Sequence, residues 1–561
     1  MRPTAIGLLL MAIGSPALAV PGPDSVAVLA NSRDRASVEL AERYIAARQI
    51  PHRQLCLLDL PLGDDVDLAT YRASIEAPFF RCLDQAGITA RIEAAVVMRG
   101  MPLRVLIPMS GGAASVSMTA ALGLYHSTTS TGAPILGQPP GVVANCGSPC
   151  LAATWPNPFR TGTFSPGYSR SVNGVSYRPL LVTMIHGRSA EEAAKLIASA
   201  TTADALGGAR GTFMFMDGAD PARGALDTDY VPAARGLNAA GFTDVVEVPF
   251  DGNATGHTLA AFFTGTAGIG QTIEGNRFLP GALVDNLTSY GAVPQNFGAP
   301  ADEVQVSIAR WVAMGVAGVH GTVDEPLNNC FPSRQLIVDY AEGGTLGEAY
   351  LRAMPFVYWR NLVLGDPMTA PYKTKTSILV DGLNEGDTVV GSRALHIETE
   401  DPLGRRVGDL WLYVDGVEAG HSRSGSLDLC LPVPVQDNLQ ILVVSQIADV
   451  HAAEYKHRPK SWLSLNVRGT AGPSDCNAPD AGTPDLGVEP LDAEIPEVGA
   501  IDGGVSERDA STAPDVASPA PDGGEVLSPG GGCSCGTSEV TTSWGSFMIV
   551  WIALLRRRGR R

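Results

Sequence analysis

The sequence predicts an α/β protein whose mostly parallel sheet is flanked by helices. Between Pro280 and Tyr372, apolar runs of strand length alternate with stretches of helical periodicity. The strand-length runs are Ala282–Leu287, Val316–Val319 and Leu362–Leu364, and the helical stretches are Val304–Met314 and Leu346–Met354. This alternation is typical of βαβ units, whose crossover helices connect parallel strands. Open α/β sheets bind ligands outside the carboxyl ends of their strands, so we expect any site there.

The same alternation precedes this stretch. Pro78 should interrupt the second helix, and Ser189 with Glu192 has the spacing of a capping box at the start of the third. The segment Ser110–Ala121 should be small and flexible, and Ser127–Tyr177 should form a long ordered loop or insertion. The expected strands are Asp24–Ala30, Gln54–Leu58, Ala94–Met98, Leu180–Ile185, Thr212–Met216, Val245–Val248 and Ala261–Thr264, and the expected helices are Arg35–Arg48, Tyr71–Gln85, Ser189–Ala200 and Val231–Ala240.

After Pro371 the pattern changes to alternating runs separated by Gly, Pro, Asp and Asn. This pattern favours a small antiparallel β-sandwich, which would be either a spacer or a binding module. We therefore expect an α/β domain over residues 20–372, which can divide into two subdomains near residue 205, and an immunoglobulin-like sandwich over residues 373–470. The expected sandwich strands are Ser377–Val380, Leu395–Thr399, Leu410–Val414, Leu439–Val444 and Trp462–Val467.

The charge of the chain is concentrated in a tail. The net charge is −18, and residues 471–532 hold thirteen Asp and Glu against one basic residue, Arg508. This segment is rich in Pro, Gly, Ala and Ser, so we expect an extended, disordered acidic linker. The remainder is only mildly acidic, and nothing in the chain is basic enough to indicate nucleic-acid binding.

The N-terminus has the features of a secretory signal over residues 1–19. Arg2 supplies the positive charge, Ile6–Ile13 the apolar run, and a small-x-small cleavage site ends at Ala19. Signal peptidase is therefore an expected partner, and export would permit disulfides. The candidate pairs are Cys56 with Cys82, Cys146 with Cys150, and Cys430 with Cys476, although sequence does not fix connectivity. Cys330 is then the odd cysteine of the folded region.

The C-terminus, residues 533–561, combines a cysteine motif, a short apolar run and an arginine cluster. Cys533 and Cys535 precede Phe547–Leu555, and five arginines lie among the last six residues. This order resembles the myxobacterial sorting signal known as MYXO-CTERM. The resemblance implies removal of the tail by a sorting protease, display at the cell surface, and processing or lipidation at Cys533. The alternative is a plain membrane anchor with its arginines on the cytoplasmic side.

Two further resemblances concern the folded part. Six stretches of the chain resemble an uncharacterised family of secreted bacterial proteins. They are LANSRDRASVELAERYIAARQIP, VVMRGMPLRV, TSYGAVPQ, GTVDEP, LGEAY and GDPMTAPY. Some members of that family carry acidic or Arg residues where this chain has Ser117, Met184 and His186, a departure that argues against a carboxylate- or metal-based activity. More distantly, the second half resembles gingipain-type cysteine peptidases, with a caspase-like fold and a final strand ending at Gly365-Asp366-Pro367.

The peptidase resemblance places the nucleophile near Ser289, where this chain has no Cys, and Phe262–Gln271 lacks the expected His. A serine without a neighbouring base is a poor nucleophile. The candidate catalytic residues are therefore Ser289, with His257 or His320 as its base, and a His320–Cys330 dyad. Structural roles for His320 and Cys330 are the alternative. His186 should belong to a turn that enters the following helix.

The candidate ligand-binding residues lie at strand ends. Arg99 and Arg104 flank Pro102 and are expected either to hold an anion or to brace the loop, and Asn31 and Ser32 end the first strand. Asp366 should cap local backbone groups. The carboxylates Asp217, Asp220, Asp227 and Asp229 fit no EF-hand spacing and should be solvated turn residues. No metal site or cofactor is predicted.

The sequence thus predicts an exported, surface-anchored protein of the cell envelope that binds an unknown surface ligand or acts as a scaffold. We expect no turnover. The alternative is a peptidase-like hydrolase that uses Ser289 or Cys330.

Overall fold

The structure is a computed structural model, and it describes residues 20–474 and 476 apart from 110–111, 125, 141–154, 161–169, 209 and 449–458. The signal segment with Ala19, most of the acidic tail, and the C-terminal motif with Cys533 lie outside the described residues. So do Cys146 and Cys150. Among the described residues, no helix is both long enough and apolar enough to span a membrane.

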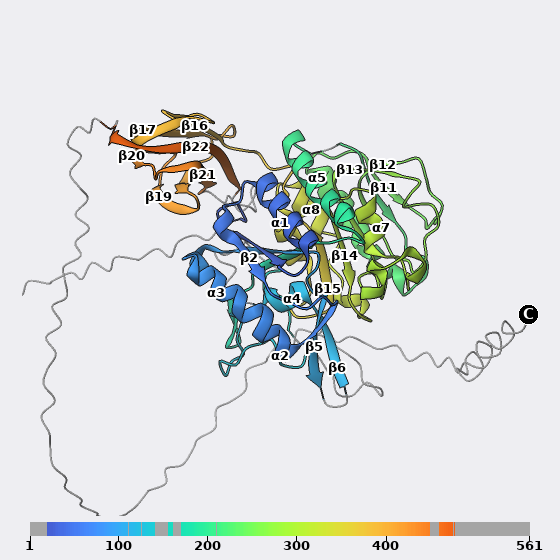
Figure 1. The fold of residues 1–561 in the computed structure, drawn as a ribbon. Coiled ribbons are helices and arrows are strands. Elements are labelled where there is room, and N and C mark those ends of the chain that lie inside the picture. The colour runs from blue at the N-terminus through green and yellow to red at the C-terminus, as the bar shows by residue number, and fades with distance from the viewer. Residues whose placement is uncertain are drawn as a thin grey trace, which may run out of the picture. The chain divides into compact units, whose positions relative to one another are not determined.

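The predicted α/β fold is confirmed by a ten-stranded sheet (Figure 1). Strands β11, β10, β12, β13 and β14 pair in parallel, and so do β9, β4, β1 and β2. Between these blocks lies β15, which is antiparallel to β14 and meets β9 through one residue pair. In sheet order the strands are β11 (Val245–Val248), β10 (Thr212–Met216), β12 (Thr258–Thr264), β13 (Arg277–Asn286), β14 (Gly318–Thr322), β15 (Asn361–Gly365), β9 (Leu181–Ile185), β4 (Ala94–Met98), β1 (Val26–Asn31) and β2 (Leu55–Leu58).

Helices cover both faces of this sheet. Along β10, Phe213 and Phe215 join one buried cluster with residues of α6, α8 and α9, whereas Met214 and Met216 join another with residues of α5 and α7. Alternate residues of a strand point to opposite faces, so each face has its own core. Figure 1 shows α1 beside α5. The helices are α1 (Arg35–Arg48), α2 (Leu68–Tyr71), α3 (Ala77–Gln85), α4 (Met118–Gly123), α5 (Ala190–Leu206), α6 (Tyr230–Ala239), α7 (Ile308–Ala313), α8 (Leu336–Ala341) and α9 (Leu346–Ala353).

Local signals in the sequence explain most of these boundaries. Ser189 caps α5 by accepting a hydrogen bond from the backbone N–H of Glu192, as its position predicts. The expected helix around Pro78 is instead α2 and α3 joined by a π-helical turn, Arg72–Glu76. Pro78 lacks an N–H and cannot make the regular bond to the preceding turn.

One predicted flexible segment is ordered. Within Ser110–Ala121, the described residues, 112–121, contain a whole strand and the start of α4, whose N-cap is Ser117. The strand lies in a small sheet of β3 (Asp65–Asp67), β5 (Arg104–Met109) and β6 (Gly112–Ser117). Its backbone pairing with β5 compensates for the weak apolar signal of Gly-Ala-Ala-Ser. Within Ser127–Tyr177, the described residues include the hairpin β7 (Arg170–Val172) and β8 (Val175–Tyr177).

The C-terminal domain is a seven-stranded mixed sheet. Its pairings are antiparallel except for β17 with β22. Leu395 of β17 shares one buried cluster with Leu412 of β18 and Ile441 of β21, and a smaller cluster contains Tyr413, Leu442 and Val444. The strands are β16 (Ser377–Asp381), β17 (Thr388–Glu400), β18 (Val407–Val414), β19 (Val417–Ser422), β20 (Ser426–Pro432), β21 (Gln436–Ile447) and β22 (Lys460–Ser474).

Two of the predicted disulfides are present. Cys56 is joined to Cys82, which ties β2 to α3, and Cys430 is joined to Cys476. A covalent link that closes a loop of 26 residues restricts the unfolded chain and stabilises the fold by about 3 kcal/mol in the chain-entropy view. Cys330 is a buried thiol.

Candidate functional site

The first candidate base, His320, lies inside the sheet. Its Nδ1 is 2.9 Å from Asp285 Oδ2 on β13, and its Nε2 is 3.0 Å from Asn361 Oδ1 on β15. The amide of Asn361 donates to the carbonyl of Cys330 at 2.8 Å, which fixes the oxygen toward the histidine. His320 and Asp285 are fully buried. A general base needs a ring nitrogen within reach of the substrate's proton, and both nitrogens of His320 already face oxygens.

Asp285 is the centre of this buried network. Besides His320 it pairs with the guanidinium of Arg334, which also donates to the carbonyl of Thr264 at 3.1 Å. Burial by itself would raise the pKa of Asp285, but the positive charge of Arg334 and the contact with His320 outweigh it and hold the pKa below its usual value. The network joins β12, β13, β14, β15 and the segment just before α8, and it has the character of a structural ion cluster.

Cys330 does not form a dyad with His320. Its side chain is fully buried and packs against Trp359, and the contact that links the two residues runs through Asn361 to the backbone carbonyl of Cys330. The thiol Sγ lies 3.6 Å from Asn329 Oδ1. A buried cysteine of this kind behaves as a small apolar residue.

Ser289 has a carboxylate as its partner instead of an imidazole. Its Oγ donates to Glu325 at 2.9 Å, and its backbone N–H donates to Gln305 at 3.0 Å. His257 precedes β12, whereas Ser289 follows β13. Because these strands are parallel and Thr258 pairs with Arg277, His257 and Ser289 lie at opposite ends of the strand pair. The structure therefore does not join Ser289 to either candidate base.

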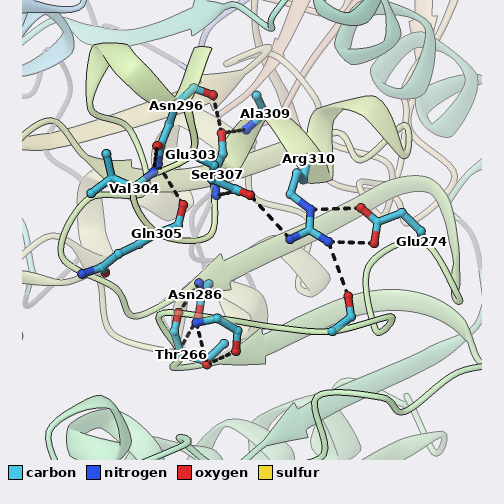
Figure 2. A network of polar contacts seen from close by, with 12 residues as sticks. Thr266, Glu274, Asn286, Asn296, Glu303, Val304, Gln305, Ser307, Ala309 and Arg310 are labelled. Carbon is cyan, nitrogen blue, oxygen red and sulfur yellow. Dashed lines mark hydrogen bonds and ion pairs between the residues drawn. The ribbon is translucent and has the colours of Figure 1, made fainter. Parts of the chain in front are cut away.

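The loops beyond β12 and β13 are held by polar contacts (Figure 2). Thr266 and Asn286 exchange two hydrogen bonds, of 2.8 and 3.0 Å, between the ends of the two strands. Arg310 binds both oxygens of Glu274, at 2.9 and 2.8 Å. Asn296 donates to two carbonyls and accepts from the N–H of Val304. These contacts fix the segment that carries Phe297.

Phe297 also lines a cavity beside the half of the sheet that contains β9, β4 and β1. The cavity has a volume of about 350 Å³ and lies at the carboxyl ends of β1, β4 and β9. We call it the strand-end cavity, and we define it by Asp34, Asp64, Arg99, Gly100, His186 and Phe297. Open α/β sheets bind ligands at such strand ends, but these are not the strand ends between Pro280 and Tyr372 where the sequence predicts the site.

Arg99 supplies the positive charge of the strand-end cavity. Its side chain is 32% exposed and lies 3.8 Å from the carboxylate of Asp34, the residue that caps α1. Its Nε makes no hydrogen bond within the described residues. Gly100 has a φ of 92°, and a side chain there would collide with Asp34, so only glycine allows the β4 loop to approach α1 this closely.

His186 is the buried wall of the strand-end cavity. It is 5% exposed, and its ring packs edge-on against Phe297 with 4.5 Å between ring centres. Burial, with a smaller contribution from the charge of Arg99, lowers the pKa of His186 to about 3. The imidazole is therefore neutral at physiological pH, and its Nδ1 has no hydrogen-bond partner among the described residues. His186 also precedes the Ser189 cap, as the predicted helix-entry turn requires.

Three of the four predicted ligand-binding residues brace loops instead. Asn31 is fully buried, donating to Gly100 O at 2.9 Å and accepting from Arg33 N–H at 3.0 Å. Ser32 donates to the carbonyl of Leu58. Arg104 makes two bonds to Asp65, of 2.6 and 3.0 Å, and a third to the carbonyl of Val323. Their hydrogen-bonding groups are used within the protein, and Arg99 is the one of the four that faces the strand-end cavity.

The predicted turn carboxylates accept hydrogen bonds within the protein, some from nearby backbone and some from distant side chains. Asp366 accepts from the N–H of Met368 and is paired with Arg48 in the core. Asp220 and Asp227 accept backbone N–H groups, and Asp229 accepts from the hydroxyl of Ser333. Within the part of the chain that the structure describes, no three His, Cys, Asp or Glu side chains are placed to hold a metal ion.

The sequence reasoning missed Asp34, Asp64 and Phe297 as walls of the cavity. Asp34 carries a local signal, because an Asp before a helical run is an N-cap at the end of a strand. Phe297 carries no local signal. It lies 111 residues after its partner His186, and no residue near it in the sequence indicates the contact.

Comparisons with known proteins give a distant likeness in fold. No family model matches the chain, and neither does any curated protein. A solved structure titled "Structure of Protease" is similar over 79% of this chain and 97% of its own, with 12% identity and a TM-score of 0.42. Fibronectin(III)-like modules of Clostridium thermocellum CbhA match 20% of this chain and 52% of theirs, with 12% identity and a TM-score of 0.15.

Proposed function

We propose that the α/β domain is a ligand-binding module without turnover, and that its site is the strand-end cavity. The observation that carries the proposal is the guanidinium of Arg99 on the wall of a cavity that also has two carboxylates, Asp34 and Asp64. The Arg99 side chain is 32% exposed and makes only a loose ion pair at 3.8 Å and a long hydrogen bond to the carbonyl of Arg188 at 3.4 Å. Its remaining N–H groups can therefore bind a ligand.

The charges of the cavity select a ligand with two kinds of group. Arg99 offers a guanidinium to a carboxylate, and the neutral ring of His186 adds a further hydrogen-bonding group beside it. Asp34 and Asp64 on the same walls offer carboxylates to an amine. A single anion would meet repulsion from both aspartates. The set is complementary to a zwitterion such as a free amino acid or the terminus of a peptide.

We further propose that this module is exported and held at the cell surface. The support is the signal segment ending at Ala19 and the C-terminal cysteine, apolar and arginine pattern. Mass spectrometry of the mature protein should then find no peptide beyond Cys535. Recovery of the Trp544–Arg556 sequence from the cell envelope would favour the plain membrane anchor.

The test of ligand binding uses isothermal titration calorimetry of the full chain with a panel of free amino acids and dipeptides. Acetate and methylamine are the singly charged controls. We expect at least one zwitterion to bind, and Arg99→Gln to weaken its binding about tenfold or more, because a charge-assisted bond is lost.

The matched control is Arg104→Gln, because its guanidinium is engaged by Asp65 and Val323 outside the cavity. This variant should bind like the parent. Equal weakening by both substitutions would contradict the proposed site, and so would the absence of binding by every zwitterion in the panel.

A further inference from the structure

The disulfide between Cys430 and Cys476 ties the last described strand of the C-terminal domain to a second strand. Cys430 lies in β20, and Cys476 lies two residues beyond the end of β22. Their Cα atoms are 5.9 Å apart, although 46 residues separate them in the sequence. The C-terminal end of β22 is therefore held by a covalent bond to β20 as well as by its own strand pairing.

Both of the tied strands pair with β17. Residues Ser392–Glu398 of β17 pair with β20, and Thr388–Ser392 pair with the end of β22. Tension that pulls on the chain beyond Cys476 must therefore displace β20 and β22 from β17 together. Without the disulfide, β22 would peel away alone from its C-terminal end, a few hydrogen bonds at a time.

The chain between the two cysteines is a closed covalent loop, and it contains β21 and β22. Tension between the two ends of the protein crosses this loop through the disulfide, so it cannot extend the residues inside the loop. An extended chain spans about 3.5 Å per residue, so the disulfide withholds about 160 Å of chain from extension.

The loop also contributes contacts between the C-terminal domain and the α/β domain. Lys460, the first residue of β22, places its Nζ 3.0 Å from Asp24 and 3.8 Å from Glu93, and these three side chains are at most 6% exposed. Gln440 of β21 donates to the carbonyl of Gln49 at 2.8 Å. Breaking a buried ion pair leaves an uncompensated charge and is strongly destabilising. Peeling of β22 would end at this junction.

We infer that Cys430–Cys476 is a mechanical clamp, which transfers tension from the C-terminal tail to β20 and so prevents β22 from peeling back to the Lys460 junction. The inference rests on the proposed function, because tension arises when the α/β domain holds a ligand while the tail is fixed at the cell surface. Cys476 lies where the C-terminal domain passes into the expected acidic linker, which is the point where such tension enters.

The test is optical-tweezers pulling of the full chain by its two ends, because forced unfolding reports the unfolding rate under load. It compares the parent with the double variant Cys430→Ser, Cys476→Ser at several constant forces. At the highest force the C-terminal domain of the variant should unfold about tenfold faster or more. The ratio of the two rates should rise with force, because a peeling strand moves its end farther before the barrier than two strands displaced together.

The matched control is the double variant Cys56→Ser, Cys82→Ser. This disulfide closes a loop of 26 residues in the α/β domain, away from the tail. Its removal should leave the unfolding rate of the C-terminal domain under load equal to that of the parent.

A second measurement uses protein that has folded with both disulfides in place. Cys430 is exposed, so dithiothreitol can reach its disulfide in the folded protein. Under steady tension, addition of dithiothreitol should be followed by a stepwise elongation as β22 peels away. The Cys56→Ser, Cys82→Ser variant should show the same step, which assigns the step to Cys430–Cys476.

Two results would overturn the inference. One is a ratio of unfolding rates that stays constant with force, which would make the disulfide a general stabiliser and not a clamp. The other is the absence of elongation under tension after maleimide labelling has shown that Cys430 is reduced. Both measurements use the purified chain, so their outcome is independent of surface anchoring, which mass spectrometry of the mature C-terminus tests.

Discussion

Two histidine–glycine pairs in this protein have the same local sequence and opposite surroundings. His320-Gly321 lies within β14, where the neighbouring strands supply an oxygen to each ring nitrogen. His186-Gly187 comes one residue after β9 ends, where the chain turns away and its Nδ1 has no partner among the described residues. One histidine is part of the sheet's internal bracing, and the other forms the wall of a cavity.

The two histidines have different surroundings because one lies within a strand and the other lies just past the end of one. His320 lies in the middle of a strand, and the two adjacent strands supply a partner to each of its ring nitrogens. A side chain just past the end of a parallel strand faces the crevice where ligands bind. The peptidase resemblance draws attention to the first histidine, whereas the geometry favours the second.

The largest expected effect is at Asp285. The substitution Asp285→Asn removes the carboxylate that pairs with Arg334 and His320, both buried. Leaving a buried cation unpaired should cost about 3–5 kcal/mol of unfolding free energy. Urea denaturation of the parent and the variant measures this loss of unfolding free energy.

The control is Asp34→Asn, which keeps an N-cap residue at a partly exposed position and should cost less than about 1 kcal/mol. If Asp285→Asn were no more destabilised than Asp34→Asn, the His320 network would not be the structural cluster described above.

A smaller effect concerns pH. The pKa of His186 is about 3 in the folded protein against an ordinary value of 6.5. Between pH 3 and pH 6.5, the unfolded chain therefore binds a proton at this histidine that the folded protein does not bind. The stability that this group contributes is complete above pH 6.5 and is lost as the pH falls toward 3. Between pH 7 and pH 5, about 2 kcal/mol should be lost.

The variant His186→Leu should lack this part of the pH dependence while remaining about as stable as the parent at pH 7. Urea denaturation of both proteins at pH 7 and pH 5 measures the difference. A loss of stability on acidification that is the same in parent and variant would show that His186 is not held neutral by burial.

The smallest effect separates the two arginines that flank Pro102. Arg104→Gln breaks two bonds to Asp65 and one to Val323, and should lower the unfolding free energy by up to about 1 kcal/mol. Arg99→Gln should change it by less than about 0.5 kcal/mol, since Arg99 makes one loose ion pair at 3.8 Å and one long hydrogen bond to the carbonyl of Arg188 at 3.4 Å. Thermal unfolding of both variants measures this order, which is the reverse of their order in ligand binding.

Much of the fold is predictable because its signals are local. The periodicity of Arg35–Arg48 and the Ser189 cap fix α1 and the start of α5 without tertiary information. The strand β6 is not predictable in this way, because Gly-Ala-Ala-Ser gains its order from pairing with β5. The antiparallel direction of β15 also depends on its neighbouring strands, and no local sequence pattern indicates which strands these are.

The proposed site was only partly predictable from the sequence. The strand-end rule pointed to the loops between Pro280 and Tyr372, whereas the proposed site lies at the ends of β1, β4 and β9, where the sequence offered Arg99 as one of four candidates. It did not separate Arg99 from Asn31 and Arg104, because their partners Gly100 and Val323 come from distant loops. The chemistry of a polar residue depends on whether such partners use up its hydrogen-bonding groups.

The most direct test of binding without turnover is activity-based labelling of the full chain with a fluorophosphonate and an iodoacetamide probe. Ser289 bonds to Glu325, His320 has both ring nitrogens engaged, and Cys330 is buried. We predict no stoichiometric labelling at Ser289 or Cys330 in the folded protein. Labelling that disappears in Ser289→Ala or Cys330→Ala would contradict this account and establish a hydrolase.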